Sequence, residues 1–191
     1  KMKNLENYYI NERKDVAIYI GHDAKTILDV GCGEGNFLRL VKQQTGAETW
    51  GVEVENKVAD IAKSKVDKIL NSTVEEALEK LPDNFFDYIT FNDVLEHLTE
   101  PIEVLKKIKV KLKKEGKIIA SIPNVRYFNT LKELLIKKDW EYKEEGILDS
   151  THLRFFTYKS MRRMFNLAGY EVIEQTGINR INTIRFKLFN F

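Results

Sequence analysis

Thr26-Ile-Leu-Asp-Val-Gly-Cys-Gly-Glu-Gly-Asn-Phe37 is the stretch of this chain that decides its fold. Its apolar beginning indicates a buried strand, its glycines a sharp turn, and the apolar spacing from Phe37 onward a helix. Glycine turns sharply at low cost and leaves room for a ligand against the backbone, and a helix N-terminus offers unpaired N–H groups. A strand, a glycine-rich turn and a helix in this order predict a nucleotide-binding corner.

The position of the third glycine distinguishes two kinds of corner. The dinucleotide fingerprint G-x-G-x-x-G needs glycine at position 36, where this chain has Asn36. The G-x-G-x-G form that it has instead, after Asp29, resembles motif I of the class I (Rossmann-like) S-adenosylmethionine-dependent methyltransferases. The resemblance implies that the turn wraps the methionine half of S-adenosylmethionine, with Asp29 on the ammonium side. The cofactor-binding residues that it implies here are Asp29, Gly31, Cys32, Gly33, Gly35 and Asn36.

The hydrophobic pattern along the chain predicts alternating strands and helices. Strands are expected at 26–30, 49–54, 67–70, 85–91 and 117–122, and helices at 8–20, 36–44, 57–65, 74–81, 101–114, 126–137 and 158–168, with Gly116 and Gly169 ending the helices that precede them. Five such units in series predict a parallel sheet between two helical layers. Two last strands, at 170–175 and 181–189, are too close for a helical crossover and are expected to be antiparallel. We therefore expect one three-layer, Rossmann-like domain over 1–191, with a seven-stranded, mostly parallel sheet and an antiparallel C-terminal pair.

The composition excludes several classes of protein. The chain has 191 residues, and its 31 basic and 29 acidic residues leave a net charge of only +2, so we expect no nucleic-acid partner. The single cysteine, Cys32, rules out an internal disulfide, and with no histidine placed for it we expect no nucleophilic role. No apolar run approaches the roughly 20 residues of a membrane span. We expect a cytoplasmic protein without a transmembrane segment; its oligomeric state is left open.

The resemblance extends to the ends of the second and third strands. It implies that Glu53 accepts hydrogen bonds from both ribose hydroxyls, with Glu55 as the fallback, and that Val54 flanks the adenine. The third strand of the family usually ends on an aspartate that faces the adenine amino group, and this chain departs from that with Asn71-Ser-Thr-Val74. A hydroxyl of Ser72 or Thr73, or the backbone of Val74, is expected to take over the contact. Either hydroxyl can also cap the next helix.

The stretch from Phe85 to Leu98 resembles the fourth strand and following loop of the family, which ends in V-L-E-H. The resemblance implies that the polar residues Asn92 and Asp93 lie at the cofactor, with the Asn92 backbone near the methionine amino group. It places Glu96 and His97 near the end where the methyl group is transferred. A capping or packing role is the alternative for His97.

The stretch from Gly146 to Tyr158 resembles a segment that lies over the active site in a subgroup of small-molecule and cell-surface-glycan methyltransferases. It implies polar groups for the substrate at His152 and Arg154. The stacking surface is expected from Trp140, Tyr142, Phe155 and Phe156. The alternative is a structured loop that His152 and Arg154 anchor.

Together these features predict a methyltransferase that moves the methyl group of S-adenosylmethionine to an oxygen or nitrogen of a small-molecule acceptor and releases S-adenosylhomocysteine. The acceptor is expected to be a sugar, glycolipid or metabolite. His97 and His152 are the candidate general bases, because histidine titrates near neutral pH. No metal is expected, since no matching ligand cluster is evident in the sequence.

Three alternatives stay open at this stage. A nicotinamide-dependent oxidoreductase would need the glycine missing at position 36. A catalytically silent partner protein of the same fold would keep the glycines but not turnover. The chain is alternatively a domain cut from a longer protein that also holds a glycosyltransferase, because Lys1 precedes Met2 and the last residues are apolar.

Overall fold

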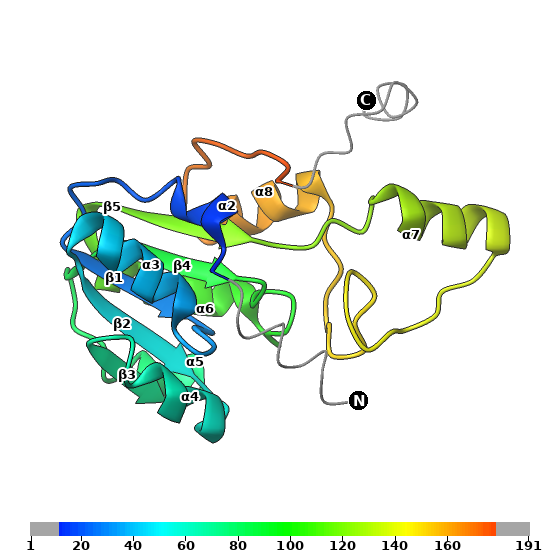
Figure 1. Ribbon diagram of the computed structural model, residues 1–191. Helices are drawn as coiled ribbons and strands as arrows, with labels where there is room; N and C mark the ends of the chain where they lie inside the picture. Colours follow the sequence, from blue (N-terminus) through cyan, green and yellow to red (C-terminus); the bar gives the residue numbers. More distant parts are fainter. Residues whose placement is uncertain (1–11, 179–191) are drawn as a thin grey trace.

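The central sheet has five parallel strands in the order β3-β2-β1-β4-β5, in a computed structural model that describes residues 12–178 (Figure 1). The strands are β1 (Thr26–Val30), β2 (Glu48–Glu53), β3 (Lys68–Asn71), β4 (Phe86–Asn92) and β5 (Leu112–Ser121). β1 lies at the centre, paired with β2 on one side and β4 on the other, and all five of its residues are buried. A strand covered on both faces needs a continuous apolar run, which is what Ile27, Leu28 and Val30 provide.

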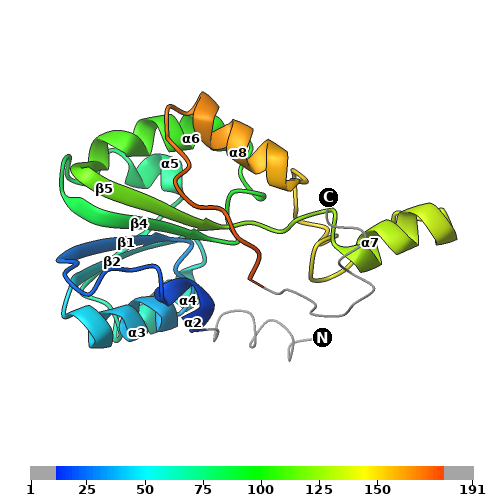
Figure 2. The same cartoon turned by 90° about the horizontal axis from the view of Figure 1, so that it is seen from above.

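Helices cover both faces of the sheet, as Figure 2 shows. One layer holds α2 (Lys14–Ala17), α3 (Asn36–Thr45) and α4 (Asn56–Ala62); the other holds α5 (Val74–Ala77), α6 (Pro101–Ile108) and α8 (Tyr158–Leu167). Each layer has its own apolar core against the sheet, one around Leu38 and Val41 and one around Phe86 and Leu105. The predicted three-layer arrangement is confirmed.

The passage from α6 to β5 differs from the sequence prediction. The helix expected to reach residue 114 ends at Ile108, a 3-10 turn follows over Lys109–Lys111, and β5 already begins at Leu112. Gly116 is not a helix stop but lies in β5, where the pairing with β4 shifts register. A Cβ atom there would stand 2.8 Å from the carbonyl oxygen of Phe86, so the bulge needs glycine.

The predicted C-terminal strand pair is not found among the described residues. Residues 170–175 lie outside any strand, and the second predicted strand, 181–189, lies outside the described residues. Polar groups of the first segment bond to helices rather than to β5: the Tyr170 hydroxyl donates to the Leu105 carbonyl at 2.8 Å, and Gln175 Nε2 donates to the Tyr158 carbonyl at 2.8 Å. The strand prediction for 170–175 was wrong for this reason, and the described sheet is entirely parallel.

Several other helices differ in extent from the prediction: α4 ends at Ala62 rather than 65, and α5 at Ala77 rather than 81. The first helix was expected over 8–20, but α2 spans only Lys14–Ala17, and residues 1–11 lie outside the described part. The helix expected over 126–137 is α7 (Phe128–Lys132) continued by the π-helical turn η2 (Glu133–Lys137), and it projects away from the sheet (Figures 1 and 2). None of the helices within residues 12–178 has the length and apolar character to cross a membrane.

Candidate active site

The glycine turn after β1 is held against the end of β2. The N–H groups of Gly31 and Cys32 both donate to the carbonyl of Val52, at 2.8 and 3.1 Å. Gly31, Gly33 and Gly35 have φ of 70, 55 and 77°, in the left-handed region that favours glycine. A Cβ atom on Gly31 would stand 2.5 Å from Val94 Cγ2, so this position also lacks room for a side chain.

Glu53 joins the end of β2 to the glycine turn. Its carboxylate accepts one hydrogen bond from the N–H of Gly33 at 3.0 Å and one from the N–H of Glu55 at 2.9 Å. A carboxylate has about four acceptor positions, so lone pairs remain for a ligand. The Asn71 side chain donates to the Glu53 carbonyl at 2.8 Å and fixes the strand end from the β3 side.

Asp29 is a buried carboxylate beneath the turn. It accepts hydrogen bonds from Thr90 Oγ1 at 2.6 Å and from Asn92 Nδ2 at 3.0 Å. Burial outweighs these bonds and raises the pKa of Asp29 to about 7. Near neutral pH the site therefore contains a carboxyl group that a nearby cation would convert fully to its charged form.

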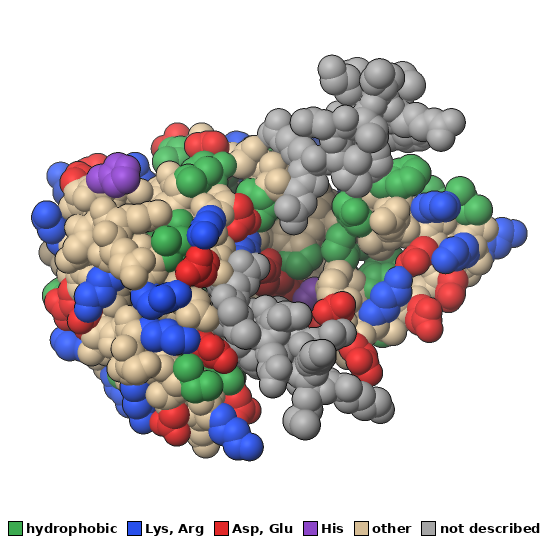
Figure 3. Space-filling model, viewed as in Figure 1, with side chains coloured by type: hydrophobic (Ala, Val, Ile, Leu, Met, Phe, Trp, Pro, Cys, Tyr) green, Lys and Arg blue, Asp and Glu red, His purple; other side chains and the backbone are tan. Residues whose placement is uncertain are grey.

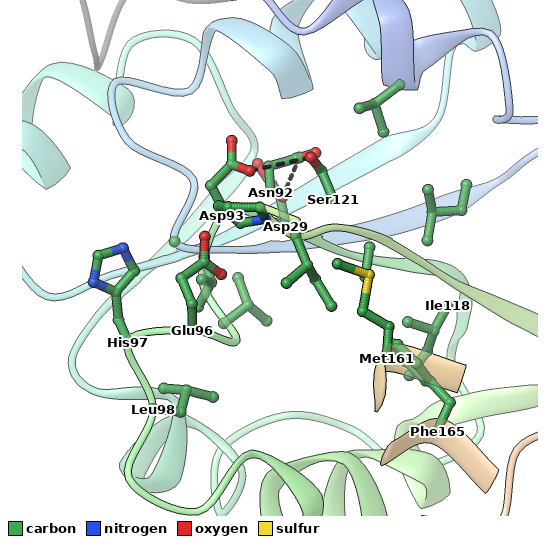
Figure 4. Close-up of a pocket in the computed structure, with 18 of the residues that line it drawn as sticks. Asp29, Asn92, Asp93, Glu96, His97, Leu98, Ile118, Ser121, Met161 and Phe165 are labelled. Carbon is green, nitrogen blue, oxygen red and sulfur yellow. Dashed lines mark hydrogen bonds between the residues drawn. The ribbon is translucent and has the colours of Figure 1, made fainter. Parts of the chain in front are cut away.

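Asp93 follows β4 in a left-handed conformation, with φ of 55°. One of its carboxylate oxygens is paired with Arg13, and the other accepts from Ser121 Oγ at 3.1 Å (Figure 4). The ends of β4 and β5 and the segment before α2 meet at this residue. The side chain that the resemblance assigned to the cofactor thus already has two protein partners.

Two polar atoms around the glycine-turn side of the pocket, Ser72 Oγ and Asn92 Oδ1, are buried and have no hydrogen-bond partner within the described part of the chain. Thr73, by contrast, caps α5, because its hydroxyl accepts from the N–H of Glu76 at 3.3 Å. Val54 is 65% exposed at the end of β2, while Val74 is buried. Buried polar atoms are nearly always hydrogen-bonded, so these two oxygens are candidate contacts for a ligand.

Glu96, His97 and His152 form one cluster, although 55 residues separate the two histidines. Their rings meet edge to face with centroids 4.7 Å apart, and His152 Nε2 lies 3.9 Å from Glu96 Oε1. Glu96 is 1% exposed, and neither carboxylate oxygen has a hydrogen-bond partner. Burial raises the pKa of Glu96 to about 8, while burial and the neighbouring His152 lower the pKa of His97.

The backbone holds this cluster together. The carbonyl of Glu96 accepts hydrogen bonds from the N–H groups of Leu153 and Arg154, at 2.9 and 3.1 Å. Arg154 also donates to the carbonyl of Thr99. Arg154 therefore anchors the segment, which agrees with the alternative given for it above.

The aromatic side chains predicted to offer a stacking surface divide into two groups. Phe155 packs edge to face on Trp140, with ring centroids 5.2 Å apart. Its ring centroid lies 6.1 Å from that of Tyr142 and 6.3 Å from that of His152. Phe156 is instead buried in the core beside α6 and α8. Phe155, Trp140 and Tyr142 thus form an aromatic cluster beside His152, although none of the three is among the residues that line the pocket, and the prediction was wrong for Phe156.

Cys32 is buried, and its thiol faces the sheet: a Cβ atom on Gly51 would stand 2.5 Å from its Sγ. Burial raises the pKa of this thiol, which disfavours the nucleophilic thiolate. This environment matches the expectation that Cys32 is not a nucleophile.

One continuous pocket at the carboxyl ends of the strands brings most of the predicted residues together. It is lined by Asp29, Gly31, Cys32, Gly33, Glu53, Val54, Ser72, Thr73, Val74, Asn92, Asp93, His97 and His152. Gly35 and Asn36 are not among its lining residues and instead begin α3. The site lies where β1 meets β4 and the strand order reverses, which is where ligands bind in open α/β sheets. Figure 3 shows histidine and acidic side chains in a hollow beside the projecting segment.

Sequence reasoning missed several lining residues. Arg13, Ser121 and Met161 come from three distant elements, and Figure 4 shows Met161 and Phe165 of α8 on the side of the pocket away from His97. Glu96 was placed near the site by resemblance but not assigned a role. Its position within V-L-E-H was the available signal, and its isolation from any donor is visible only in the structure.

Comparison with known proteins gives a consistent result. The model of a family described as "Methyltransferase domain" matches residues 4–175. The ubiquinone biosynthesis O-methyltransferase of Aeromonas salmonicida is 27% identical over 163 residues, covering 81% of this chain and 66% of that protein. The protein of that name from Coxiella burnetii is 27% identical over 186 residues, covering 94% of this chain and 77% of that protein. A structure described as a SAM-dependent methyltransferase from Archaeoglobus fulgidus has a TM-score of 0.66 at 24% identity, covering 87% and 69%, and at that identity the likeness is one of fold.

Proposed function

The chain belongs to the methyltransferase-domain family, and from that premise we propose that it transfers the methyl group of S-adenosylmethionine to an oxygen or nitrogen of a small molecule. The observation that carries the proposal is the pair of orphaned oxygens, Ser72 Oγ and Asn92 Oδ1, on either side of the glycine turn. Both lie in the pocket that the turn borders.

The residues at the glycine turn fit this cofactor. Glu53 keeps free lone pairs for two ribose hydroxyls, and the exposed Val54 offers an apolar side chain beside the adenine. Of the two hydroxyl groups expected near the adenine, that of Ser72 is the one available to bond it, because the Thr73 hydroxyl caps α5. Asp29 and Asn92 Oδ1 supply negative charge and an acceptor for an ammonium group. Gly35 and Asn36 contribute through the start of α3.

When bound, S-adenosylmethionine supplies a methyl group on a positively charged sulfur, which departs as S-adenosylhomocysteine when a lone pair of the acceptor displaces it. The chain's own residues align the acceptor and exclude water. Holding the reacting groups in line can lower the barrier by roughly 7–11 kcal/mol. We assign His97 and His152 to the acceptor side, as the residues that help the acceptor lose its proton.

A small acceptor fits the surroundings of these histidines. Phe155, with Trp140 and Tyr142 against it, forms an aromatic cluster that contacts His152, one of the residues that line the pocket. The relatives named above act in ubiquinone biosynthesis as O-methyltransferases, and a hydroxylated ring would fit beside such an aromatic cluster. We therefore place a hydroxylated metabolite ahead of the sugar and glycolipid classes. The predictions of a single domain, a cytoplasmic location and no nucleic-acid partner stand as part of the same proposal.

Calorimetric titration of the purified chain with S-adenosylmethionine, S-adenosylhomocysteine and NADH tests the proposal. Micromolar binding of the two sulfur ligands, and none of NADH, is the expected result. Binding of NADH alone would support the oxidoreductase alternative. If neither sulfur ligand binds, the proposal fails, and a silent partner protein becomes the better interpretation.

Turnover is tested separately by a screen of hydroxyl and amine acceptors with radiolabelled methyl donor. Label in a hydroxylated aromatic compound is the expected result. Cofactor binding without transfer to any acceptor class in the screen would favour the catalytically silent alternative.

A further inference from the structure

Three side chains that are typical metal ligands converge on the acceptor side of the pocket. One ligand atom from each of Glu96, His97 and His152 lies within 4.8 Å of the others, a grouping that the sequence did not predict. All three residues line the pocket. Two imidazoles with one carboxylate are a common ligand set of catalytic zinc and iron sites, in which a further coordination position stays open for substrate.

Neither oxygen of the buried Glu96 carboxylate has a hydrogen-bond partner among residues 12–178. The residue is 1% exposed, and the nearest imidazole nitrogen, His152 Nε2, is 3.9 Å away, too far for a hydrogen bond. An isolated buried carboxyl group is costly, and structures rarely keep one without a cation or a donor. A cation held between these side chains would stabilise the charged form of the Glu96 carboxylate.

The hydrogen bonds of the two histidines leave their lone pairs free. His152 Nδ1 lies 3.0 Å from the carbonyl of Ile147, and His97 Nδ1 lies 3.2 Å from the carbonyl of Thr151. A carbonyl oxygen only accepts, and the Thr151 hydroxyl, also 3.2 Å from His97 Nδ1, donates instead to Asp149 at 2.7 Å. This assigns the proton to both Nδ1 atoms and the lone pair to both Nε2 atoms. Metal-binding histidines are typically fixed in this way, by donation of the second ring N–H to a backbone carbonyl or carboxylate.

The distances require only a small contraction. Ligand atoms on a tetrahedral ion with bonds of about 2.0–2.2 Å stand roughly 3.4 Å apart. The bonds from the N–H groups of Leu153 and Arg154 to the Glu96 carbonyl fix the backbone at Glu96, so the contraction would have to come from the side chains.

We propose that Glu96, His97 and His152 bind one divalent transition-metal ion of the zinc class, with an open position for an oxygen of the acceptor. The role of the ion in methyl transfer rests on the proposed function; its binding does not. A hydroxyl bound to the ion would lose its proton to solvent at a lower pH, and its oxygen would then form the new bond to the methyl group as the methyl–sulfur bond breaks and its electron pair stays on sulfur. The two histidines would thus activate the acceptor through the metal.

Cobalt binding tests the site without reference to activity. Tag-free protein, freed of metal by a chelator, is titrated with Co²⁺ and followed by visible absorption, and Zn²⁺ is then added in competition. We expect one Co²⁺ per chain, displaced by Zn²⁺. Glu96→Gln and His152→Ala should each weaken Co²⁺ binding by more than about 100-fold, since loss of outer-shell partners alone costs 10–100-fold. His22→Ala, at the only other histidine and an exposed one, is the matched control and should bind as the wild type does.

S-adenosylhomocysteine is titrated into every variant to separate the two proposals. Retained binding shows that a variant is folded, and the half-buried His97→Ala replaces His152→Ala if that protein does not fold. Failure of the wild type to bind Co²⁺ and Zn²⁺, or wild-type affinity in Glu96→Gln and a folded histidine variant, would overturn the metal site while leaving cofactor binding untouched. Loss of S-adenosylhomocysteine binding with Co²⁺ binding intact would sink the proposed function alone.

Discussion

The carboxylate of Glu53 accepts a hydrogen bond of 3.0 Å from the backbone N–H of Gly33, so a strand end and a turn 20 residues earlier in the chain form one unit. This bond holds the carboxylate where its remaining lone pairs face the pocket. Substitution of Glu53 by alanine should reduce affinity for S-adenosylhomocysteine by at least about tenfold, because each hydrogen bond to a charged group contributes about 1.5–3 kcal/mol. Calorimetry measures the change. The exposed neighbour Glu55→Ala is the control, and an equal loss there would show that Glu53 is not the ribose ligand.

The glycine turn gives a second prediction. Gly33 and Gly46 both have positive φ, 55 and 70°, so alanine at either costs about 1–2 kcal/mol of stability. Gly46 ends α3, and a Cβ atom there would meet nothing within 4 Å. We expect Gly33→Ala to lose S-adenosylhomocysteine affinity by more than about tenfold, since the turn must lie against the ligand, and Gly46→Ala to keep it. Equal affinities in the two variants would refute the assignment of the turn.

Ser72 and Thr73 should respond in opposite ways to alanine. Thr73 caps α5, so Thr73→Ala should lower the free energy of unfolding by about 1 kcal/mol and leave affinity unchanged. Ser72 Oγ has no hydrogen-bond partner in the part of the chain that the structure describes, so Ser72→Ala should leave stability unchanged or slightly higher and weaken S-adenosylmethionine binding about three- to tenfold. Urea unfolding and calorimetry on the same two proteins provide the comparison. The reverse pattern would assign the adenine contact to Thr73.

Asp29 should make stability depend on pH. Its pKa in the folded chain, about 7, is above the ordinary value of 3.8, so the folded state keeps a proton that the unfolded chain loses. The contribution of Asp29 to the free energy of unfolding therefore falls by at most about 4 kcal/mol as pH rises from about 4 to about 7. Above that range it is constant. In Asp29→Asn, whose amide oxygen can still accept from Thr90, this part of the slope should disappear. Parallel curves of unfolding free energy against pH for the two proteins would contradict the raised pKa.

Ionisation of Asp29 should have the opposite effect on cofactor binding, whose affinity should rise with pH. An ammonium group is attracted by the charged form of Asp29, so S-adenosylhomocysteine affinity of the wild type should rise between pH 6 and pH 8. Asp29→Asn should show a weaker rise. Calorimetry at three pH values measures the affinity of both proteins. If the affinity of the wild type falls over this range, the charge pairing is excluded.

His152→Ala should separate binding from transfer. The residue lies on the acceptor side, so S-adenosylhomocysteine binding should be unchanged while methyl transfer slows about 100-fold or more. The measurement is kcat with whichever acceptor the screen identifies. His22, exposed at the opposite, amino end of β1, provides the control substitution. Wild-type turnover of His152→Ala would leave His152 as a loop anchor.

The sequence predicted the parts of the site whose chemistry is local. The glycine turn, Glu53 at its strand end and the cap at Thr73 each depend on neighbours within a few residues or on a fixed strand geometry. Gly116 was misinterpreted because its role depends on the carbonyl of Phe86, on another strand. Glycine suits the end of a helix and a β-bulge equally well, and only the contact with the neighbouring strand distinguishes these two roles.

The acceptor side could not be derived in the same way. His97 and His152 were each noticed, but their contact depends on how the segment before α8 bonds to the Glu96 carbonyl. The lack of donors around Glu96 is likewise a property of packing. The predicted strand at 170–175 failed because its apolar residues fit a strand and a helix-packed segment alike, and the bond from Tyr170 to Leu105 selects the second.

The place of β1 in the sheet has a consequence for how the protein is made. Thr26 pairs with Glu48, but on its other edge Ile27 pairs with Tyr88, 61 residues further along the chain. A ribosome therefore completes β1, β2 and β3, with the glycine turn, well before β4 exists. During that interval the most apolar strand has an open edge, which other chains can pair with. Slow translation between residues 72 and 92 should accordingly increase aggregation of the newly made protein, and fragments that stop there should be insoluble.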